Sequence, residues 1–182
     1  KINKNFEPLL LFISLLDSQD IPQGLLEMYM GPEKVRNFIY HLKKFSLITN
    51  KLFHSESTLS IHRHTQKIHL AYFTSVLKLK ENHQLIQSIT DTLEKYIREA
   101  INKENNTSTK LSEKHAKMFL AHSNLLTDSM KGAIAGELGR IYIFKGDYTQ
   151  GIRILEDSII ALSKSYNKIH IKVAHVLGYL GL

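Results

Sequence analysis

The amino-acid sequence predicts a mainly α-helical protein, in which a winged helix-turn-helix domain with a small β-wing precedes a superhelix of stacked helix pairs. Three observations lead to this prediction. The 182 residues include 9 Gly, 3 Pro and no Cys, which excludes loop-rich, collagen-like and disulfide-stabilised proteins. Most apolar residues recur every three to four positions, as on one face of a helix. The last third of the chain is self-similar at a spacing of 42 residues, which is typical of repeat proteins.

The first segment contains the patterns of three short helices. Residues 9–16 form an apolar run, which indicates a helix at the centre of a core. A second helix is expected to start at Asp20-Ile21-Pro22 and to end at Gly31, and Pro32 opens the third. The third helix has an amphipathic stripe of Val35, Phe38, Ile39, Leu42 and Phe45.

Two short strands are expected after these helices. Residues 46–49 and 52–53 look extended, Ser55-Glu56-Ser57 favours a turn, and residues 58–61 alternate with a period of two. Two strands after three helices indicate a winged helix. With a fourth helix from about His62 to Leu79, this domain covers residues 1–79.

The rest of the chain is predicted to be helical. Residues 80–127 are interpreted as a helical linker or a degenerate repeat, and the polar stretch 102–110 as an exposed loop. Helices are expected over 111–124, 128–144 and 148–163, with a break at Gly146-Asp147. The repeats occupy residues 128–182, as one full unit and one partial unit.

The segment around residue 140 carries the first resemblance to a known family. It contains Leu138-Gly139-Arg140-Ile141-Tyr142, Gly146-Asp147-Tyr148, Gly151, Leu155 and Ser158-Ile159. This set resembles a tetratricopeptide repeat, and the 42-residue period looks like the longer-linker variant of kinesin light chains. Small Gly139 would let the two helices approach, and Gly146 would supply the tight turn between them.

A second resemblance lies in residues 59–66, Leu-Ser-Ile-His-Arg-His-Thr-Gln. This segment resembles the end of the winged-helix domain in signal-transduction NTPases of the NB-ARC (STAND) type. The resemblance implies that His62 is a sensor that contacts the β-phosphate of bound ADP. It also implies ADP or ATP with Mg²⁺ as cofactors of the parent protein, bound by an upstream nucleotide-binding domain in cis. The chain contains no Gly-x-x-x-x-Gly-Lys-Ser/Thr loop, so we expect no cofactor and no catalysis in this fragment.

We therefore expect a regulatory and protein-interaction fragment, with repeats that bind a protein or peptide partner. By position, the resemblance places Ala133, Gly136, Arg140, Ile143 and Phe144 on the partner-binding groove. Arg140 is the expected polar anchor, because a guanidinium can pair with a carboxylate at two points. A plain tetratricopeptide adaptor without any nucleotide link is one alternative.

A DNA-binding regulator is the other alternative. The net charge is +7, and residues 1–80 carry +5 of it, with 11 Lys and Arg against 6 Asp and Glu. The helix from Pro32 could present Arg36, Lys43 and Lys44 to DNA, with Asn37 and His41 nearby and Lys51 and His54 on the wing. Such binding would weaken steeply with salt.

Two further expectations concern metals and location. The spacing of His62, His64 and His69 does not suit a metal site, so none is predicted. The apolar run 9–16 is about half as long as a membrane span, so we expect a cytoplasmic protein without membrane association. Because the chain begins with Lys1 and ends within a helical pattern at Leu182, we interpret it as a piece of a longer polypeptide.

Overall fold

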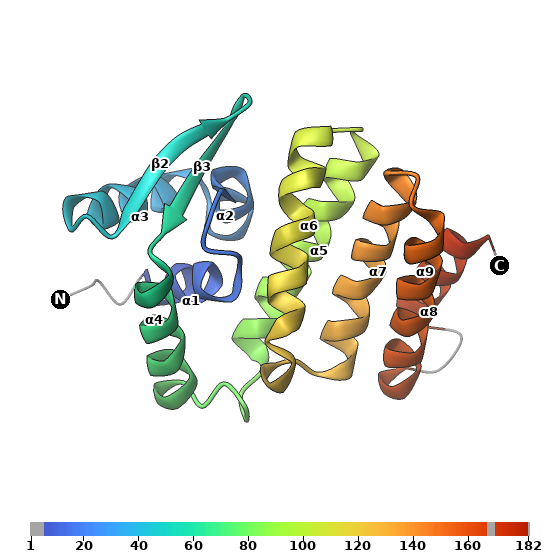
Figure 1. Cartoon of the computed structure of the whole chain (residues 1–182). Helices are drawn as coiled ribbons and strands as arrows, with labels where there is room; N and C mark the ends of the chain where they lie inside the picture. Colours follow the sequence, from blue (N-terminus) through green and yellow to red (C-terminus); the bar gives the residue numbers. More distant parts are fainter. Residues whose placement is uncertain (1–5, 167–169, 182) are drawn as a thin grey trace.

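The computed structural model describes residues 6–166 and 170–181. The outer ends of the predicted domains 1–79 and 128–182, and residues 167–169, lie outside the described residues. The described chain is mainly helical and has a small antiparallel sheet, which confirms the predicted fold class at this level (Figure 1).

The first part of the chain alternates helices with short strands. The elements are α1 (Glu7–Leu15), β1 (Ile21–Pro22), α2 (Gln23–Met30), α3 (Pro32–Lys44), β2 (Ile48–Phe53), β3 (Glu56–Ile61) and α4 (Arg63–Val76). The sheet has the order β1-β3-β2, and both pairs are antiparallel. Ile21 lies opposite Leu59, and Ile48 lies opposite Ile61, and all four side chains are buried in the core.

The structure corrects two local expectations in this part. Ile21 and Pro22 do not begin a helix but form β1, and α2 starts after Pro22. Proline is tolerated there because β1 is an edge strand, where a missing N–H does not interrupt the sheet. The hairpin turn lies at His54, whose φ of 46° is left-handed, and Glu56 already belongs to β3.

The second part of the chain is a row of packed helices (Figure 1). They are α5 (Gln84–Asn102), α6 (Asn106–Ala121), the short 3-10 helix η2 (Ser123–Leu125), α7 (Asp128–Phe144), α8 (Tyr148–Ser165) and α9 (Ile171–Leu180). Helix α7 packs most extensively on α8, and it also contacts α5 and α6.

The expectation of an exposed loop over residues 102–110 is wrong. Helix α6 already begins at Asn106, and Ser108 and Thr109 are buried. The Asn105 side chain caps the helix by accepting the backbone N–H of Ser108 at 3.0 Å. The polar stretch therefore contains the capped start of α6, which packs against neighbouring elements. Only residues 103–105 connect α5 with α6.

Glycines allow α7 and α8 to pack closely, as expected for Gly139. A Cβ atom at Gly139 would lie 2.7 Å from Cγ of Leu155 and 3.1 Å from the carbonyl oxygen of Gly151. Gly146 between the helices has a φ of 83°, which favours glycine in the tight turn. Gly178 in α9, by contrast, has nothing within 4 Å of the corresponding position.

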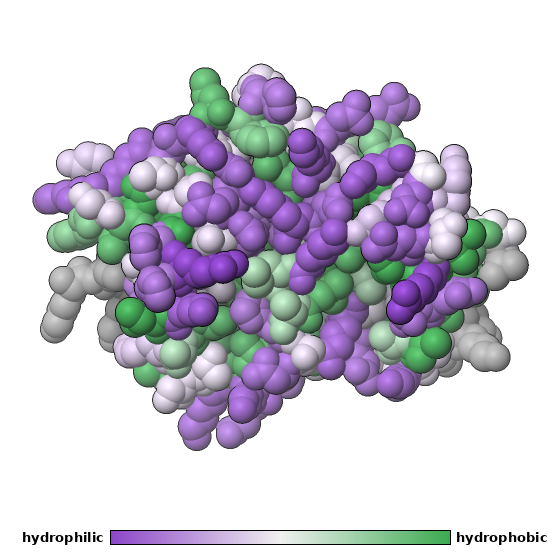
Figure 2. Space-filling view, viewed as in Figure 1, coloured by the Kyte–Doolittle hydropathy of each residue, from purple (hydrophilic) through white to green (hydrophobic). Residues whose placement is uncertain are grey.

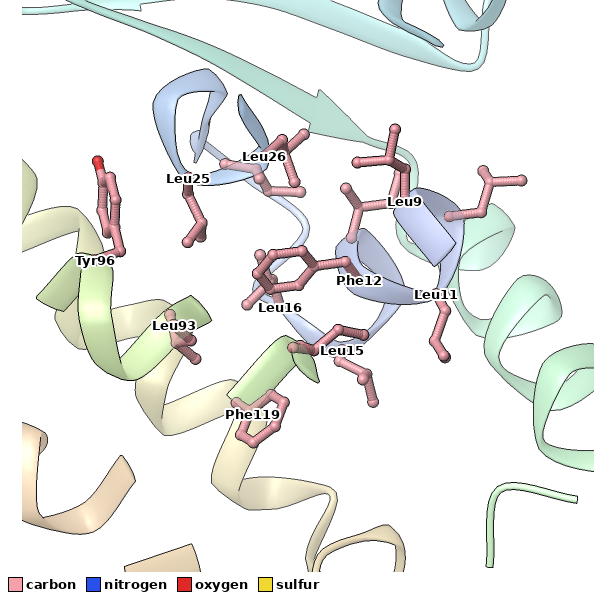
Figure 3. Close-up of a cluster of buried hydrophobic side chains, with 14 of the residues drawn as sticks. Leu9, Leu11, Phe12, Leu15, Leu16, Leu25, Leu26, Leu93, Tyr96 and Phe119 are labelled. Carbon is pink, nitrogen blue, oxygen red and sulfur yellow. The ribbon is translucent and has the colours of Figure 1, made fainter. Parts of the chain in front are cut away.

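One hydrophobic core connects the two parts of the chain. Leu15 and Leu16 of α1 lie in the same cluster as Leu93 of α5 and Phe119 of α6, and all four are fully buried (Figure 3). The cluster continues to Tyr142 in α7. A second, smaller cluster around Leu155 and Val176 joins α8 to α9.

Polar contacts run along the same boundary. Asp20, just before β1, forms an ion pair with Lys51 of β2 at 2.7 Å and accepts a hydrogen bond from Lys114 of α6 at 2.9 Å. Burial raises the pKa of Asp20, but the ammonium groups of Lys51 and Lys114 outweigh burial and hold this pKa below its usual value. The ring Nε2 of fully buried His115 lies 3.0 Å from the backbone carbonyl of Asp20. Burial lowers the pKa of His115 to about 4.

The hairpin adds a second set of polar contacts. Glu56 of β3 accepts hydrogen bonds from the hydroxyl of Tyr96 in α5 and from Ser108 Oγ in α6, the latter at 2.9 Å. Burial, together with the carboxylate of Glu56, raises the pKa of Tyr96. The sheet is therefore held against α5 and α6 by both packing and specific hydrogen bonds.

We expect Gly139→Ala to lower the free energy of unfolding by about 1–3 kcal/mol, because the added methyl overlaps Leu155 and the backbone of Gly151. The matched control is Gly178→Ala, which should raise it by roughly 0.5–1 kcal/mol, since the helix gains alanine's propensity without a clash. Urea denaturation measures both. Equal effects of the two substitutions would contradict the close approach of α7 and α8.

We also expect His115 to make stability depend on pH. Its pKa of about 4 in the folded chain lies below the ordinary 6.5, so the unfolded chain takes up the proton first as the pH falls. Between pH 7 and 4, the free energy of unfolding of the wild type should therefore fall relative to that of His115→Gln, by up to about 3 kcal/mol. The exposed His175→Gln is the control, and pH profiles of wild type and His115→Gln that run parallel would argue against this assignment.

Candidate functional site

The predicted groove residues come together in a depression on α7. Arg140, Ile143 and Phe144 line it with Ile101 at the end of α5 and Tyr179 of α9. Its volume is about 240 Å³, and most of its surface is apolar. Phe144 is 36% exposed, so an aromatic ring lies at the rim of the depression. The arrangement can accept an apolar side chain from a partner between the three helices.

Arg140 is held by its own chain rather than left free. Its Nη1 donates to Glu137 at 2.9 Å, its Nη2 donates to Asn102 at 3.0 Å, and the guanidinium lies 4.4 Å from the ring centre of Tyr179. Its side chain is 15% exposed. Arg140 therefore shapes the wall of the depression, and a carboxylate from a partner would compete with Glu137.

A chain of ion pairs extends from Arg140 across α5, α7 and α9. Glu137 also accepts from Arg98 at 3.2 Å, and Arg98 reaches Glu94 at 2.5 Å. Glu94 in turn accepts from Lys172 of α9 at 3.2 Å. Lys172 also lies 3.7 Å from Asp91, so three cations face three carboxylates and the surface beside the depression is polar but close to neutral.

Burial is the largest influence on the pKa of Glu137, the carboxyl at the centre of this chain of ion pairs. Glu137 is 2% exposed, and this burial raises its pKa, while Arg140 and Arg98 work in the opposite direction. Burial of Arg98 would lower the pKa of its guanidinium, but Glu137 and Glu94 raise it. Breaking either arginine contact would leave a buried carboxylate short of partners, which is costly.

The other two predicted groove residues lie deeper. Ala133 is buried, and a Cβ at Gly136 would lie 3.0 Å from Val176 of α9, so α9 covers both positions. Ile101 and Tyr179 were missed by the sequence reasoning. Tyr179 lies 42 residues after Glu137, so the 42-residue spacing of the sequence could have indicated it. Ile101 lies before the segment with the 42-residue spacing, so the sequence offered no signal for it.

His62 occupies the N-cap position of α4, directly after β3. Its Nδ1 accepts the backbone N–H of His64 at 3.3 Å, and the two rings stack with centres 5.4 Å apart. With Nδ1 in this contact, Nε2 is the ring nitrogen left for a further hydrogen bond. The exposed ring lines a shallow depression with Gln19, Ser46 and Thr49, where Nε2–H can act as a donor.

The basic residues considered for DNA lie on the outer face of α3. Arg36, Lys43 and Lys44 are exposed, and among the described residues no carboxylate lies within 4.0 Å of their side-chain nitrogens. Asn37 and His41 share this exposed face, whereas Lys51 in β2 is paired with Asp20. The face is available to a polyanion but shows no feature that selects DNA.

Neither a metal centre nor a membrane segment is found in the part of the chain that the structure describes. Its His, Asp and Glu side chains form no group of three or more that could hold a metal ion. None of its helices has both the length and the apolar character needed to cross a bilayer.

Comparison of the chain with protein-family models, with curated proteins and with solved structures finds no match.

Proposed function

We propose that this chain is a regulatory and protein-interaction fragment of a multidomain signalling NTPase of the STAND type. In this proposal, residues 1–79 are a winged helix that senses nucleotide state through His62, and residues 128–182 are tetratricopeptide-type repeats that bind a protein partner. The observation that carries the proposal is the depression in which Arg140, Ile143 and Phe144 lie together.

The order of elements supports the winged helix. Helix α1, strand β1, helices α2 and α3 and the hairpin β2–β3 follow one another as in that fold, with β1 at the edge of the hairpin. The hairpin contacts α5 and α6 through Glu56, so a change at the winged helix has a physical route to the helices beyond.

The packing of α5 to α9 supports the repeat assignment. Helix α7 packs on α8, and α9 packs on α8 and α7, as in a stack where each helix pair contacts the next. Helices α5 and α6 contact each other and α7 in the same manner, so the segment 80–127 is suited to a degenerate first pair. A stack of this kind can hold a partner on one side of its helices.

The position of His62 supports the sensor role. The exposed ring lies at the start of α4, where backbone N–H groups and the helix dipole favour negative charge. A phosphate delivered there by an upstream domain would receive a hydrogen bond from the imidazole. Loss of the phosphate would remove that bond and release the contact.

The groove is tested by site-specific photo-crosslinking in cells that express the natural protein. A photoreactive amino acid at Phe144 should yield a discrete covalent adduct, because an apolar partner side chain would enter the depression there. The same amino acid at Ile160, which is 59% exposed on α8, is the matched control and should yield none. Ile143→Ser should reduce the Phe144 adduct about tenfold.

Adducts of equal yield at Phe144 and Ile160, or no adduct at Phe144, would reject the groove assignment. A substitution of Arg140 is less suitable, because it would leave Glu137 buried with one partner fewer and so disturb folding.

The sensor role is tested in the intact parent protein with His62→Ala. Loss of a hydrogen bond to a charged phosphate should accelerate ADP release about tenfold or more and raise basal activity. The exposed His175→Ala on α9 is the control. If ADP is retained equally by His62→Ala and by the wild type, His62 is not the sensor.

A further inference from the structure

The positive charge of the chain is concentrated in one continuous segment. Residues 34–80 contain nine Lys and Arg residues and a single acid, Glu56, whereas the rest of the chain contains 15 Lys and Arg against 16 Asp and Glu. Glu56 itself accepts hydrogen bonds from Tyr96 and Ser108. Hydrophilic side chains cover much of the region of α3 and the hairpin, at the upper left of Figure 2. This segment is therefore the part of the chain that suits a polyanion.

The outer side of α3 combines exposed cations with an exposed aromatic ring. Tyr40 is 64% exposed. Arg36 lies four residues before Tyr40, and Lys43 and Lys44 lie three and four residues after it, so all three are its neighbours on the surface of the helix. We call these four residues the α3 face, which extends over about 12 Å. All three cations are exposed, and among the described residues no carboxylate lies within 4.0 Å of their side-chain nitrogens.

The rest of α3 holds this face toward the outside. The opposite side of the helix is buried in the core and comprises Val35, Phe38, Ile39 and Leu42. The helix therefore cannot rotate without exposing apolar side chains, which is unfavourable. One acid, Glu33, is exposed in the first turn of α3. The positive potential of the helix consequently belongs to its second and later turns, which carry the α3 face.

We propose that the α3 face binds single-stranded nucleic acid. Arg36, Lys43 and Lys44 would neutralise phosphates, and the ring of Tyr40 would stack on the face of a base. Cations alone would attract any polyanion, whereas the ring among them adds a contact that only a base can use. Both kinds of contact are independent of the base sequence and of the sugar, so the face would accept RNA as well as DNA.

The exposed ring also decides between the possible polyanions. In a duplex the bases stack on one another and offer only their edges in the grooves, so Tyr40 would find no free base face. An anionic bilayer would suit the cations, but it binds helices that insert a broad apolar side, and the α3 face has one ring. An acidic peptide would pair with the cations and leave the ring unused.

This inference goes beyond the proposed function and does not depend on it. The α3 face includes neither His62 nor any residue of the depression at Arg140. Failure of the experiments on His62 and Phe144 would therefore leave the α3 face untouched, and the reverse also holds.

The test measures the binding of fluorescein-labelled oligonucleotides to the 182-residue chain by fluorescence anisotropy. The probes are single-stranded oligo(dT) and oligo(rU) of about 12 nucleotides and a duplex of the same length, with unlabelled inorganic polyphosphate of matched charge as competitor. We expect both single strands to bind at least about fivefold more tightly than the duplex, and polyphosphate to compete at least about fivefold less well than an unlabelled single strand. The logarithm of the association constant should fall against the logarithm of the salt concentration with a slope of about −2, because each of three neutralised phosphates contributes about −0.7.

Substitutions of Tyr40 separate stacking from charge. Tyr40→Ala should weaken binding of the single strands at least about fivefold, whereas Tyr40→Phe keeps the ring and should change it less than about twofold. Tyr148→Ala on α8 is the matched control, because Tyr148 is 63% exposed. The chain contains no Trp, so Tyr40→Trp introduces a single indole, whose emission should be quenched when a base stacks on it. The emission of Tyr148→Trp should not change.

Substitutions of the cations test the phosphate contacts. Arg36→Gln combined with Lys43→Gln should weaken binding at low salt and change the slope from about −2 to about −0.7. The matched control is Arg153→Gln combined with Lys164→Gln, which removes the same charge from exposed positions on α8 and should leave the slope unchanged. Circular dichroism verifies that each variant remains folded.

Several results would overturn the proposal. These are no binding of either single strand up to about 100 μM protein at low salt, equal competition by polyphosphate, and unchanged binding by Tyr40→Ala. Duplex binding that equals or exceeds single-strand binding would assign the face to duplex DNA instead. Co-sedimentation with phosphatidylserine vesicles that requires Arg36 and Tyr40, without oligonucleotide binding, would assign it to a membrane.

Discussion

Helix α1 is buried on every side, and the arrangement of the other elements follows from the need to cover it. From Leu9 to Leu16 every side chain is 2% exposed or less. Phe6 packs edge-on against Phe38 of α3, and Phe12 packs in the same way against Tyr29 of α2. The helices of the second part close the remaining side, where Leu93 and Phe119 approach Leu15 and Leu16 (Figure 3). A helix that is hydrophobic all round requires such a cover, since each exposed leucine would forgo about 1.5–3 kcal/mol of burial.

Polar groups determine how the two parts meet over this core. Hydrophobic contact alone is non-directional and tolerates sliding. The hydrogen bonds of Asp20 with Lys114, and of Glu56 with Tyr96 and Ser108, cross between the two parts and require one relative alignment of them. The boundary between the two parts is therefore specified by polar geometry and stabilised by apolar burial.

The sequence predicted those elements whose signals are local. The apolar run in α1, the stripe of α3 and the turn at Gly146 were all recognisable from spacing and residue type, and the structure confirms these elements. Strand β1 was missed because its two residues gain strand character only from pairing with Thr58 and Leu59, far along the chain.

Residues 106–110 were misassigned for a related reason. Within this stretch Ser108 and Thr109 are buried, and Ser108 donates to Glu56 on a distant strand, so no local pattern contains that information. At the candidate site, helical spacing brought Arg140, Ile143 and Phe144 onto one face, but Ile101 and Tyr179 depend on how α5 and α9 pack against α7. The hydrogen bonds of Arg140 to Glu137 and Asn102 could not be predicted either, because the contact with Asn102 depends on how α5 packs against α7.

Gln66 gives α4 a mechanical role. Its buried side-chain amide donates to the backbone carbonyls of Ile13 and Leu16, at 2.8 and 2.7 Å, where α1 ends and has no further turn to satisfy them. Removing the Gln66 amide while α4 and α1 stay packed would leave both carbonyls buried without this donor, at a cost of about 1–3 kcal/mol each. The Gln66 contacts therefore tie the first turn of α4, directly after His62, to the end of α1, where Leu15 and Leu16 enter the core.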